Sequence, residues 1–190
     1  MPMHKEKHIH LITERLIIRP IDISDAPALF GYRSNKEVNR YQGWIPETPE
    51  DAVQFILEKV SPLLNVPGTW YQLALINPEN QEMVGDIGIH FPESEPQQIE
   101  LGCSLNHRYQ GKGFAYEALV KIISTIFSQL DKTRAIAVID SRNVPSVRLI
   151  ERLGFQKKAH IKDNRDRNGE PIDELVYAMK KEDWQALHSF

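Results

Sequence analysis

Apolar and polar positions recur along this chain with two different periods, and these periods indicate its helices and strands. Residues 113–129 carry apolar side chains three or four positions apart, which predicts a long amphipathic helix. The same spacing predicts shorter helices at about 25–34, 48–60 and 145–153. Apolar residues that alternate with polar ones, or run continuously, predict strands. These strands are expected at 16–19, 70–76, 83–91, 99–105, 134–139 and 172–180.

Residues at the ends of these segments support the same boundaries. Thr48 can cap the second helix because Pro49 follows at its first position, and Gly154 can end the short helix. The segment 163–170, rich in charge and glycine, is expected to be a loop. The order of the elements predicts an α/β (α+β) fold, in which a mixed sheet is flanked by helices.

Composition narrows the class of protein. The 190 residues suit one domain, expected to cover 11–190 after a flexible polar tail at 1–10. A net charge of −3 does not favour direct nucleic-acid binding, and no apolar run approaches the ~20 residues of a membrane span. The single cysteine, Cys103, is typical of a reducing compartment, so we expect a cytoplasmic protein without membrane partners. The histidines of the tail are not expected to bind a metal.

The segment before the long helix carries the clearest chemical motif. It runs from Arg108 to Gly113 and contains a second glycine, Gly111. Two glycines one residue apart let the backbone bend closely and turn several N–H groups in one direction. The helix that follows adds unpaired N–H groups and the positive end of its dipole. Such a place suits a phosphate or pyrophosphate.

Spacing excludes two familiar phosphate loops. In a P-loop the first glycine position would hold Asn106, and Gly113 follows Lys112 where Ser or Thr is needed. In a dinucleotide-binding loop the third small residue would be Tyr116. The pattern that remains is Arg-x-x-Gly-x-Gly.

That pattern resembles the acyl-CoA loop of the GNAT superfamily of N-acetyltransferases, whose backbone amides hold the pyrophosphate of coenzyme A. Further along, Asn143 and Ser146 open a short helix that closes with Leu-Gly-Phe at 153–155, which resembles the second GNAT signature. The segments 13–20 and 175–184 are similar to those of the branch that acetylates ribosomal-protein N-termini (alanine or serine). The resemblance covers residues 11 to about 185.

The resemblance implies a fold and a cosubstrate. A GNAT-type sheet is mixed, mostly antiparallel, and splays where the pantetheine arm of acetyl-CoA lies. The amides of residues 108–113 are expected to hold the pyrophosphate, and Asn143 to reach the pantetheine arm, because Pro145 would place the helix cap at Val144. Arg108 and Lys112 either contact phosphates or are ordinary solvated cations. The expected coenzyme contacts are Leu105, Arg108, Gln110, Gly111, Lys112, Gly113, Asn143 and Ser146.

The implied reaction is direct transfer of an acetyl group to a primary amine, without a covalent enzyme intermediate. Ser146 is the candidate that stabilises or protonates the leaving thiolate, unless it only bonds the first helical turn. Glu100 is the first candidate for the base, with Asp86 and His90 as alternatives. A backbone N–H from a bulged strand near 87–89 is expected to stabilise the oxyanion. Cys103 lies on the apolar face of its strand, which argues against an acyl-cysteine.

The acceptor is the least defined part of the prediction. Tyr41, Trp44 and His90 are candidates for binding it. An α-amine, with a pKa near 8, needs only a modest base, so the N-terminus of a ribosomal or other protein is the first expectation. A small amine such as a polyamine, amino acid or antibiotic is the alternative, and a non-catalytic acyl-CoA-binding module is a third reading. The chain is expected to be a monomer or a homodimer.

Overall fold

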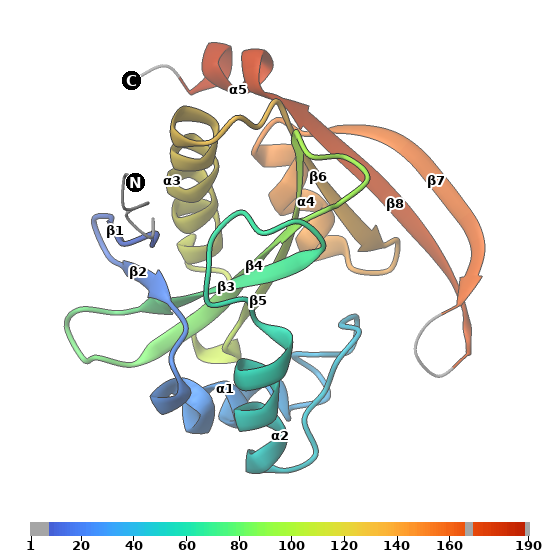
Figure 1. Cartoon of the computed structure of the whole chain (residues 1–190). Coiled ribbons are helices and arrows are strands. Elements are labelled where there is room, and N and C mark those ends of the chain that lie inside the picture. Colours follow the sequence, from blue (N-terminus) through green and yellow to red (C-terminus); the bar gives the residue numbers. More distant parts are fainter. Residues whose placement is uncertain (1–7, 166–168, 189–190) are drawn as a thin grey trace.

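The computed structural model describes residues 8–165 and 169–188, which form one mixed sheet covered by helices on both faces (Figure 1). Eight strands pair in the order β1-β2-β3-β4-β5-β6-β8-β7, and only β5 and β6 run parallel. The strands are β1 (Leu11–Ile12), β2 (Ile17–Pro20), β3 (Thr69–Ile76), β4 (Met83–Phe91), β5 (Gln98–Leu105), β6 (Arg134–Asp140), β7 (Gln156–Arg165) and β8 (Pro171–Lys180).

Five α-helices and three short turns connect the strands in the described part of the chain. The α-helices are α1 (Ala26–Arg33), α2 (Pro49–Gln54), α3 (Phe114–Gln129), α4 (Val144–Arg152) and α5 (Lys181–Leu187). The short turns are η1 (Ile23–Asp25), η2 (Phe55–Lys59) and η3 (His107–Tyr109). None of the helices described here is long and apolar enough to cross a membrane.

The two faces of the sheet support two cores. On one face, apolar residues of β3, β4 and β5 pack against α3, whose stripe includes Ala118, Leu119 and Ile122. On the other face, Ala74 and Ile76 of β3 pack against α1 and α2. The near-continuous apolar run of β3 follows directly from this arrangement, because its side chains are buried on both faces.

The parallel pairing of β5 with β6 is short, and this decides where a ligand can enter. The paired residues run only from Gln98 to Glu100 on β5, opposite Arg134 to Ile136 on β6. Beyond that point β5 stays paired with β4 while β6 pairs with β8, so the sheet opens between β5 and β6. This confirms the predicted α/β fold with a splayed, mostly antiparallel sheet.

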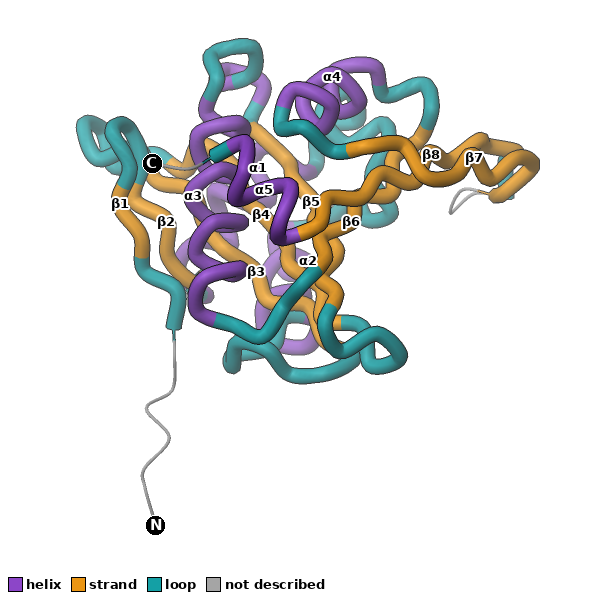
Figure 2. Tube along the Cα trace, turned by 90° about the horizontal axis from the view of Figure 1, so that it is seen from above, coloured by secondary structure: helices purple, strands orange, loops and turns teal. Residues whose placement is uncertain are grey.

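The structure also contains elements that the periodicity does not predict. The strand β7 is exposed along its whole length, so it carries no apolar alternation, and the β7–β8 hairpin projects from the body of the protein (Figure 2). Of the loop predicted at 163–170, residues 163–165 belong to β7 and 166–168 lie outside the described residues. Ile9 is buried in the core, so order begins within the predicted tail, whose residues 1–7 are also outside the described part.

Candidate active site

The turn before α3 presents a row of backbone N–H groups. The amides of Arg108, Tyr109 and Gln110 are used inside η3, where they donate to Asn106 and His107. The amides of residues 111–116, in contrast, donate to no group in the described chain. Gly111 and Gly113 have φ angles of 73° and 86°, a left-handed conformation that glycine adopts without a steric cost. The free N–H groups thus lie at 111–116 rather than at the predicted 108–113, and their role in holding a pyrophosphate stays a prediction.

Several side chains of the predicted loop stabilise it. Arg108 lies 3.5 Å from the carboxylate of Glu82, and Gln110 Nε2 donates to the carbonyl of Leu105 at 3.1 Å. Lys112 Nζ lies 5.7 Å from the centre of the Tyr109 ring. Arg108 and Gln110 thus have protein partners, which leaves the main chain as the phosphate-facing feature of this turn.

Arg15 supports this turn, a contact that the sequence analysis did not predict. Its Nη1 donates to the carbonyl of Lys112 at 3.0 Å, and its Nε donates to Glu117 at 2.7 Å. The guanidinium also lies 4.4 Å over the ring of Phe114. Arg15 therefore fixes the glycine turn to the first turn of α3, although the two segments lie far apart in the sequence.

The open edge of β5 is the second feature of the site. The carbonyl of Gln97 accepts hydrogen bonds from Thr133 and Arg134, so odd-numbered residues of β5 direct their backbone groups toward β6. Past Glu100 the edge of β5 that faces β6 has no paired strand residue. The side-chain amide of Gln42 donates to the carbonyl of Cys103 there, at 3.2 Å. In this register the N–H of Leu101 is the last to pair with β6, opposite Ile136, so the N–H group of Cys103 faces the gap.

This geometry corrects the predicted source of the oxyanion donor. Strand β4 pairs without a break with β3 and β5 from Gly85 to His90, so its N–H groups near 87–89 belong to the sheet. The irregularity in β4 lies opposite the step from Leu75 to Ile76. The edge of β5, rather than a bulge in β4, offers free donors.

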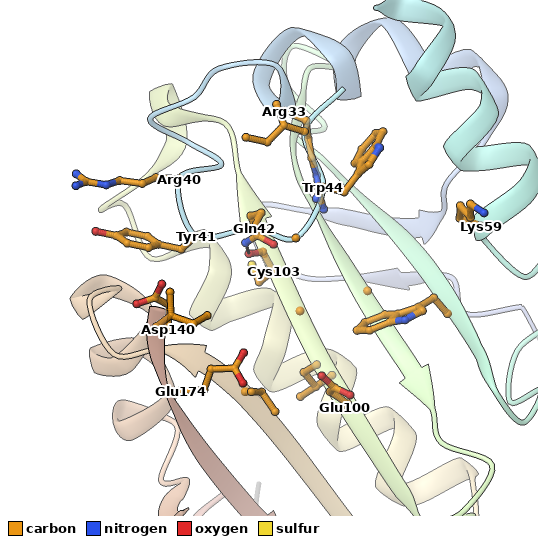
Figure 3. A pocket seen from close by; sticks show the side chains of 18 of the residues that line it. Arg33, Arg40, Tyr41, Gln42, Trp44, Lys59, Glu100, Cys103, Asp140 and Glu174 are labelled. Atoms are coloured by element: carbon orange, nitrogen blue, oxygen red, sulfur yellow. Dashed lines mark hydrogen bonds between the residues drawn. The ribbon is translucent and has the colours of Figure 1, made fainter. Parts of the chain in front are cut away.

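Two cavities meet at this edge. The larger, about 720 Å³, lies between α1–α2 and β8, and the smaller, about 110 Å³, lies between β5, β6 and α4. Both are lined by Tyr41, Gln42, Leu101, Gly102, Cys103, Val138 and Asp140. Asn143 and Ser146 line only the smaller cavity, whereas Glu100 and Trp44 line only the larger one (Figure 3). A thioester in the small cavity would thus meet an acceptor in the large one.

The start of α4 differs from the prediction in one detail. Asn143, not Val144, caps the helix, since its Oδ1 accepts the N–H of Ser146 at 3.3 Å. Its Nδ2 and the Ser146 hydroxyl have no hydrogen-bond partner among the described residues. Both side chains therefore retain a donor for a ligand in the smaller cavity.

Of the candidate bases, Glu100 is placed best. Its side chain is 29% exposed within the larger cavity, and its Oε2 lies 3.4 Å from Nδ1 of His90. The His90 ring stacks on Trp70 at 4.9 Å between centres, so His90 supports Glu100 from behind the cavity wall. This arrangement leaves a carboxylate facing the acceptor with an imidazole behind it.

The position of Asp86 argues against its candidacy as the base. It is fully buried, lines neither cavity, and accepts hydrogen bonds from Tyr32, Arg33 and Gln72. Burial, together with the charge of Asp86, raises the pKa of the Tyr32 hydroxyl well above its usual value. A carboxylate so fully bonded serves to hold Arg33 in place.

The pKa values of two further groups, Cys103 and Asp140, are shifted where the two cavities meet. Burial raises the pKa of Cys103 to about 12, so its thiol stays protonated, in line with the argument against an acyl-cysteine. Asp140 was missed by the sequence analysis because its position only becomes visible once β6 and α4 are folded. The hydrogen bonds from Arg142, at 2.6 and 2.9 Å, hold the pKa of Asp140 below its usual range.

Comparison with known proteins matches this geometry to a family. Residues 15–156 match the model of the acetyltransferase (GNAT) domain. The chain belongs to the GNAT family. The uncharacterised N-acetyltransferase p20 of Bacillus licheniformis is 30% identical over 174 residues, which cover 92% of this chain and 97% of that protein. These matches confirm the predicted family, and this GNAT protein is an acetyl-CoA-dependent N-acetyltransferase.

Two further similarities concern the branch and the fold. The alanine N-acetyltransferase of ribosomal protein uS5 from Escherichia coli is 27% identical over 184 residues, with 93% of each chain covered. The crystal structure of a GNAT-family acetyltransferase from Bacillus anthracis has a TM-score of 0.80 and 27% identity, and covers 92% of this chain and 99% of that one.

Proposed function

We propose that this GNAT enzyme transfers the acetyl group of acetyl-CoA to the α-amine of a peptide or protein N-terminus, by direct attack of the amine. The observation that carries the proposal is the acid–base content of the acceptor cavity. Of the other carboxylates at or near this cavity, Asp86 is sealed in the core, Asp140 is held by Arg142, and Glu174 accepts a hydrogen bond from the side chain of Asn164. Glu100 remains, a modest base that suits an amine of modest basicity.

The energetics favour an α-amine over a lysine. An α-amine has a pKa near 8, so making it neutral at pH 7 costs about 1 kcal/mol. A lysine side chain has a pKa near 10.4, and the same step costs about 4–5 kcal/mol. Glu100, backed by His90, can accept a proton directly or through water. The similarity to the uS5-alanine enzyme of Escherichia coli supports the same acceptor class.

The site fits acetyl-CoA, which supplies an activated acetyl thioester when bound. The unpaired amides of residues 111–116 are suited to the pyrophosphate, since main-chain donors at a helix start favour anions. The open edge of β5 is suited to the amides of the pantetheine arm, which can pair with it as an added strand. Asn143 and Ser146 in the smaller cavity offer the remaining polar contacts.

The chain's own groups divide the chemical tasks between them. The N–H group of Cys103, which faces the gap, can stabilise the oxygen that gains charge during attack. Ser146 can donate a hydrogen bond to the departing sulfur. Tyr41 is a second hydroxyl that lines both cavities, and its ring lies within 6 Å of Arg40 and Arg142. The single variants Ser146→Ala and Tyr41→Phe, compared with the double variant, would separate the contributions of the two hydroxyls.

The decisive experiment measures the release of free coenzyme A thiol with matched acceptors. The first acceptor is a peptide with a free α-amine. The second is the same peptide with its α-amine blocked and an internal lysine free, and the third is a set of small amines. We expect turnover with the free α-amine only. Turnover of the blocked peptide, or of small amines alone, would refute the proposal, and thiol release that no amine stimulates would indicate a non-catalytic module.

Glu100→Gln provides the matching test of the base. We expect this variant to lower kcat/KM at least tenfold near pH 7, with a smaller loss at high pH, where more of the amine is already neutral. Glu79→Gln, an identical change on the exposed turn between β3 and β4, serves as the control. Equal activities of the two variants would remove Glu100 from the mechanism.

A further inference from the structure

The larger cavity carries an unusual charge for a chain whose net charge is −3. Lys36, Arg40 and Lys59 line it, and none of the three forms an ion pair within the described residues. We infer that these residues select acidic acceptors, namely peptides whose side chains just after the reacting amine are carboxylates. This inference rests on the proposed function, because it specifies the peptide that enters the acceptor cavity.

The acidic residues of the same cavity cancel these cations only in part, because six Lys and Arg side chains line it against three Asp and Glu side chains. Asp140 is bonded by two nitrogens of Arg142, and Glu174 accepts a hydrogen bond from the side chain of Asn164. Glu100 faces His90. Arg33 is likewise neutralised, by Asp86. The hydrogen bond from the neutral Asn164 does not remove the charge of Glu174, but Lys and Arg still outnumber Asp and Glu around the cavity, so an approaching acceptor meets a positive potential.

The cation-bearing segments are fixed in place by the core. Lys36 and Arg40 lie in the connection from α1 to α2, and Lys59 ends η2. Trp44 from the connection stacks on Phe55 of η2, with ring centres 4.3 Å apart. The guanidinium of Arg33, held by the buried carboxylate below it, lies 5.8 Å from the centre of the Trp44 ring. The backbone positions from which the cations extend are thereby set before an acceptor binds.

The positions of these cations indicate how an acceptor peptide would run through the larger cavity. Its amine must reach the junction with the smaller cavity, near Gln42 and Cys103. Arg40 lies beside Tyr41 on one side of the cavity, and Lys59 lies on the opposite side, beyond Trp44 (Figure 3). Residues that follow the amine would therefore pass between cations. A carboxylate there is attracted, whereas a second amine, as in a polyamine, is repelled.

The test compares three peptides that share their N-terminal residue and differ only at positions three to five, which are all Glu, all Gln or all Lys. We expect kcat/KM to fall in the order Glu, Gln, Lys, mainly through KM, and the preference for Glu to shrink as salt is added. Exposed pairs of this kind are weak, so each cation should account for about a two- to fivefold effect.

Charge-reversal variants locate the effect. Lys36→Glu, Arg40→Glu and Lys59→Glu should each lower activity toward the acidic peptide and raise it toward the basic one, and the triple variant should reverse the order. Lys121→Glu, the same change on the exposed side of α3, is the control and should leave the preference intact.

The outcomes separate this inference from the function on which it rests. Acetylation of all three peptides at equal rates, or a preference for the Lys peptide, would overturn the inference and leave peptide acetylation standing. Transfer to none of the peptides would overturn both. A preference for Glu that survives the triple variant would also overturn it, since the selection would then come from elsewhere in the protein.

Discussion

Replacing Gly111 by valine tests the coenzyme cradle most directly. Gly111 has a φ angle of 73°, and a Cβ atom added there would meet nothing within 4 Å. Valine is therefore not excluded by crowding, but it disfavours the left-handed backbone by about 1–3 kcal/mol. The turn can relieve this strain by rotating out of the left-handed region, and that rotation turns the amides of the cradle away from the ligand.

The size of the effect follows from the bonds at risk. A hydrogen bond to a charged group contributes about 1.5–3 kcal/mol, so losing two of them weakens coenzyme A binding by about 3–6 kcal/mol, or roughly a hundred- to ten-thousandfold in Kd. The fold should survive with a fall in Tm of a few degrees, because about 1 kcal/mol shifts a domain of this size by about 2–4 °C. Calorimetric titration with coenzyme A and thermal unfolding measure the two quantities.

Two other variants isolate the cause. Gly169 has a φ angle of 81° and equally open surroundings, but it lies in the β7–β8 hairpin, so Gly169→Val should cost similar stability and leave the Kd unchanged. Gly111→Asn should retain most of the binding, because asparagine tolerates the left-handed region. A folded Gly111→Val protein that binds coenzyme A as tightly as the unmodified protein would refute the assignment of the cradle.

Four further outcomes are expected. Ser146→Ala should lower kcat more than it weakens acetyl-CoA binding, and an unchanged kcat would remove its role at the sulfur. Asp86→Ala leaves the charge of a buried partner uncompensated, which should cost about 3–5 kcal/mol and lower Tm by about 10 °C in a melting experiment. Cys103 should react with a disulfide reagent at pH 8 at least tenfold more slowly than free cysteine until the protein unfolds, since its pKa is raised to about 12. Burial alone would raise the pKa of Glu117, but the hydrogen bonds that it accepts from Thr13 and Arg15 hold this pKa below the usual value. The carboxylate therefore stabilises the fold above the ordinary Glu pKa near 4.3, and this stabilisation is lost as pH falls. Glu117→Gln should flatten the fall in Tm between about pH 5 and 3.

Local patterns in the sequence determined most of the secondary structure. The second helix begins after Thr48, which forms a capping box with Asp51, and the stripe of the long helix faces the core as its period predicts. These signals are readable because a helix cap or an apolar period involves residues within one or two turns of each other. The glycine turn before α3 belongs to the same class, since its backbone conformation depends on Gly111 and Gly113 themselves.

Strand β7 shows where local signals end. It has no buried face, so only its pairing with β8 makes it a strand. The same limit applies to Asp86: alternation placed it on the face of β4 that carries Gly88 and His90, but could not show that Arg33 and Tyr32 from α1 would enclose it.

The sequence determined some features of the candidate site, and the tertiary structure determined the others. The sequence determined that a turn with two glycines precedes a long helix, and that Asn143 and Ser146 open a later one. Only the tertiary structure decided which amides remain unpaired, that Arg15 holds the turn, and that Asp140 lies where two cavities meet. The physical reason is that a backbone turn is governed by its own residues, whereas the partners and solvent access of a polar group depend on segments brought together only by folding.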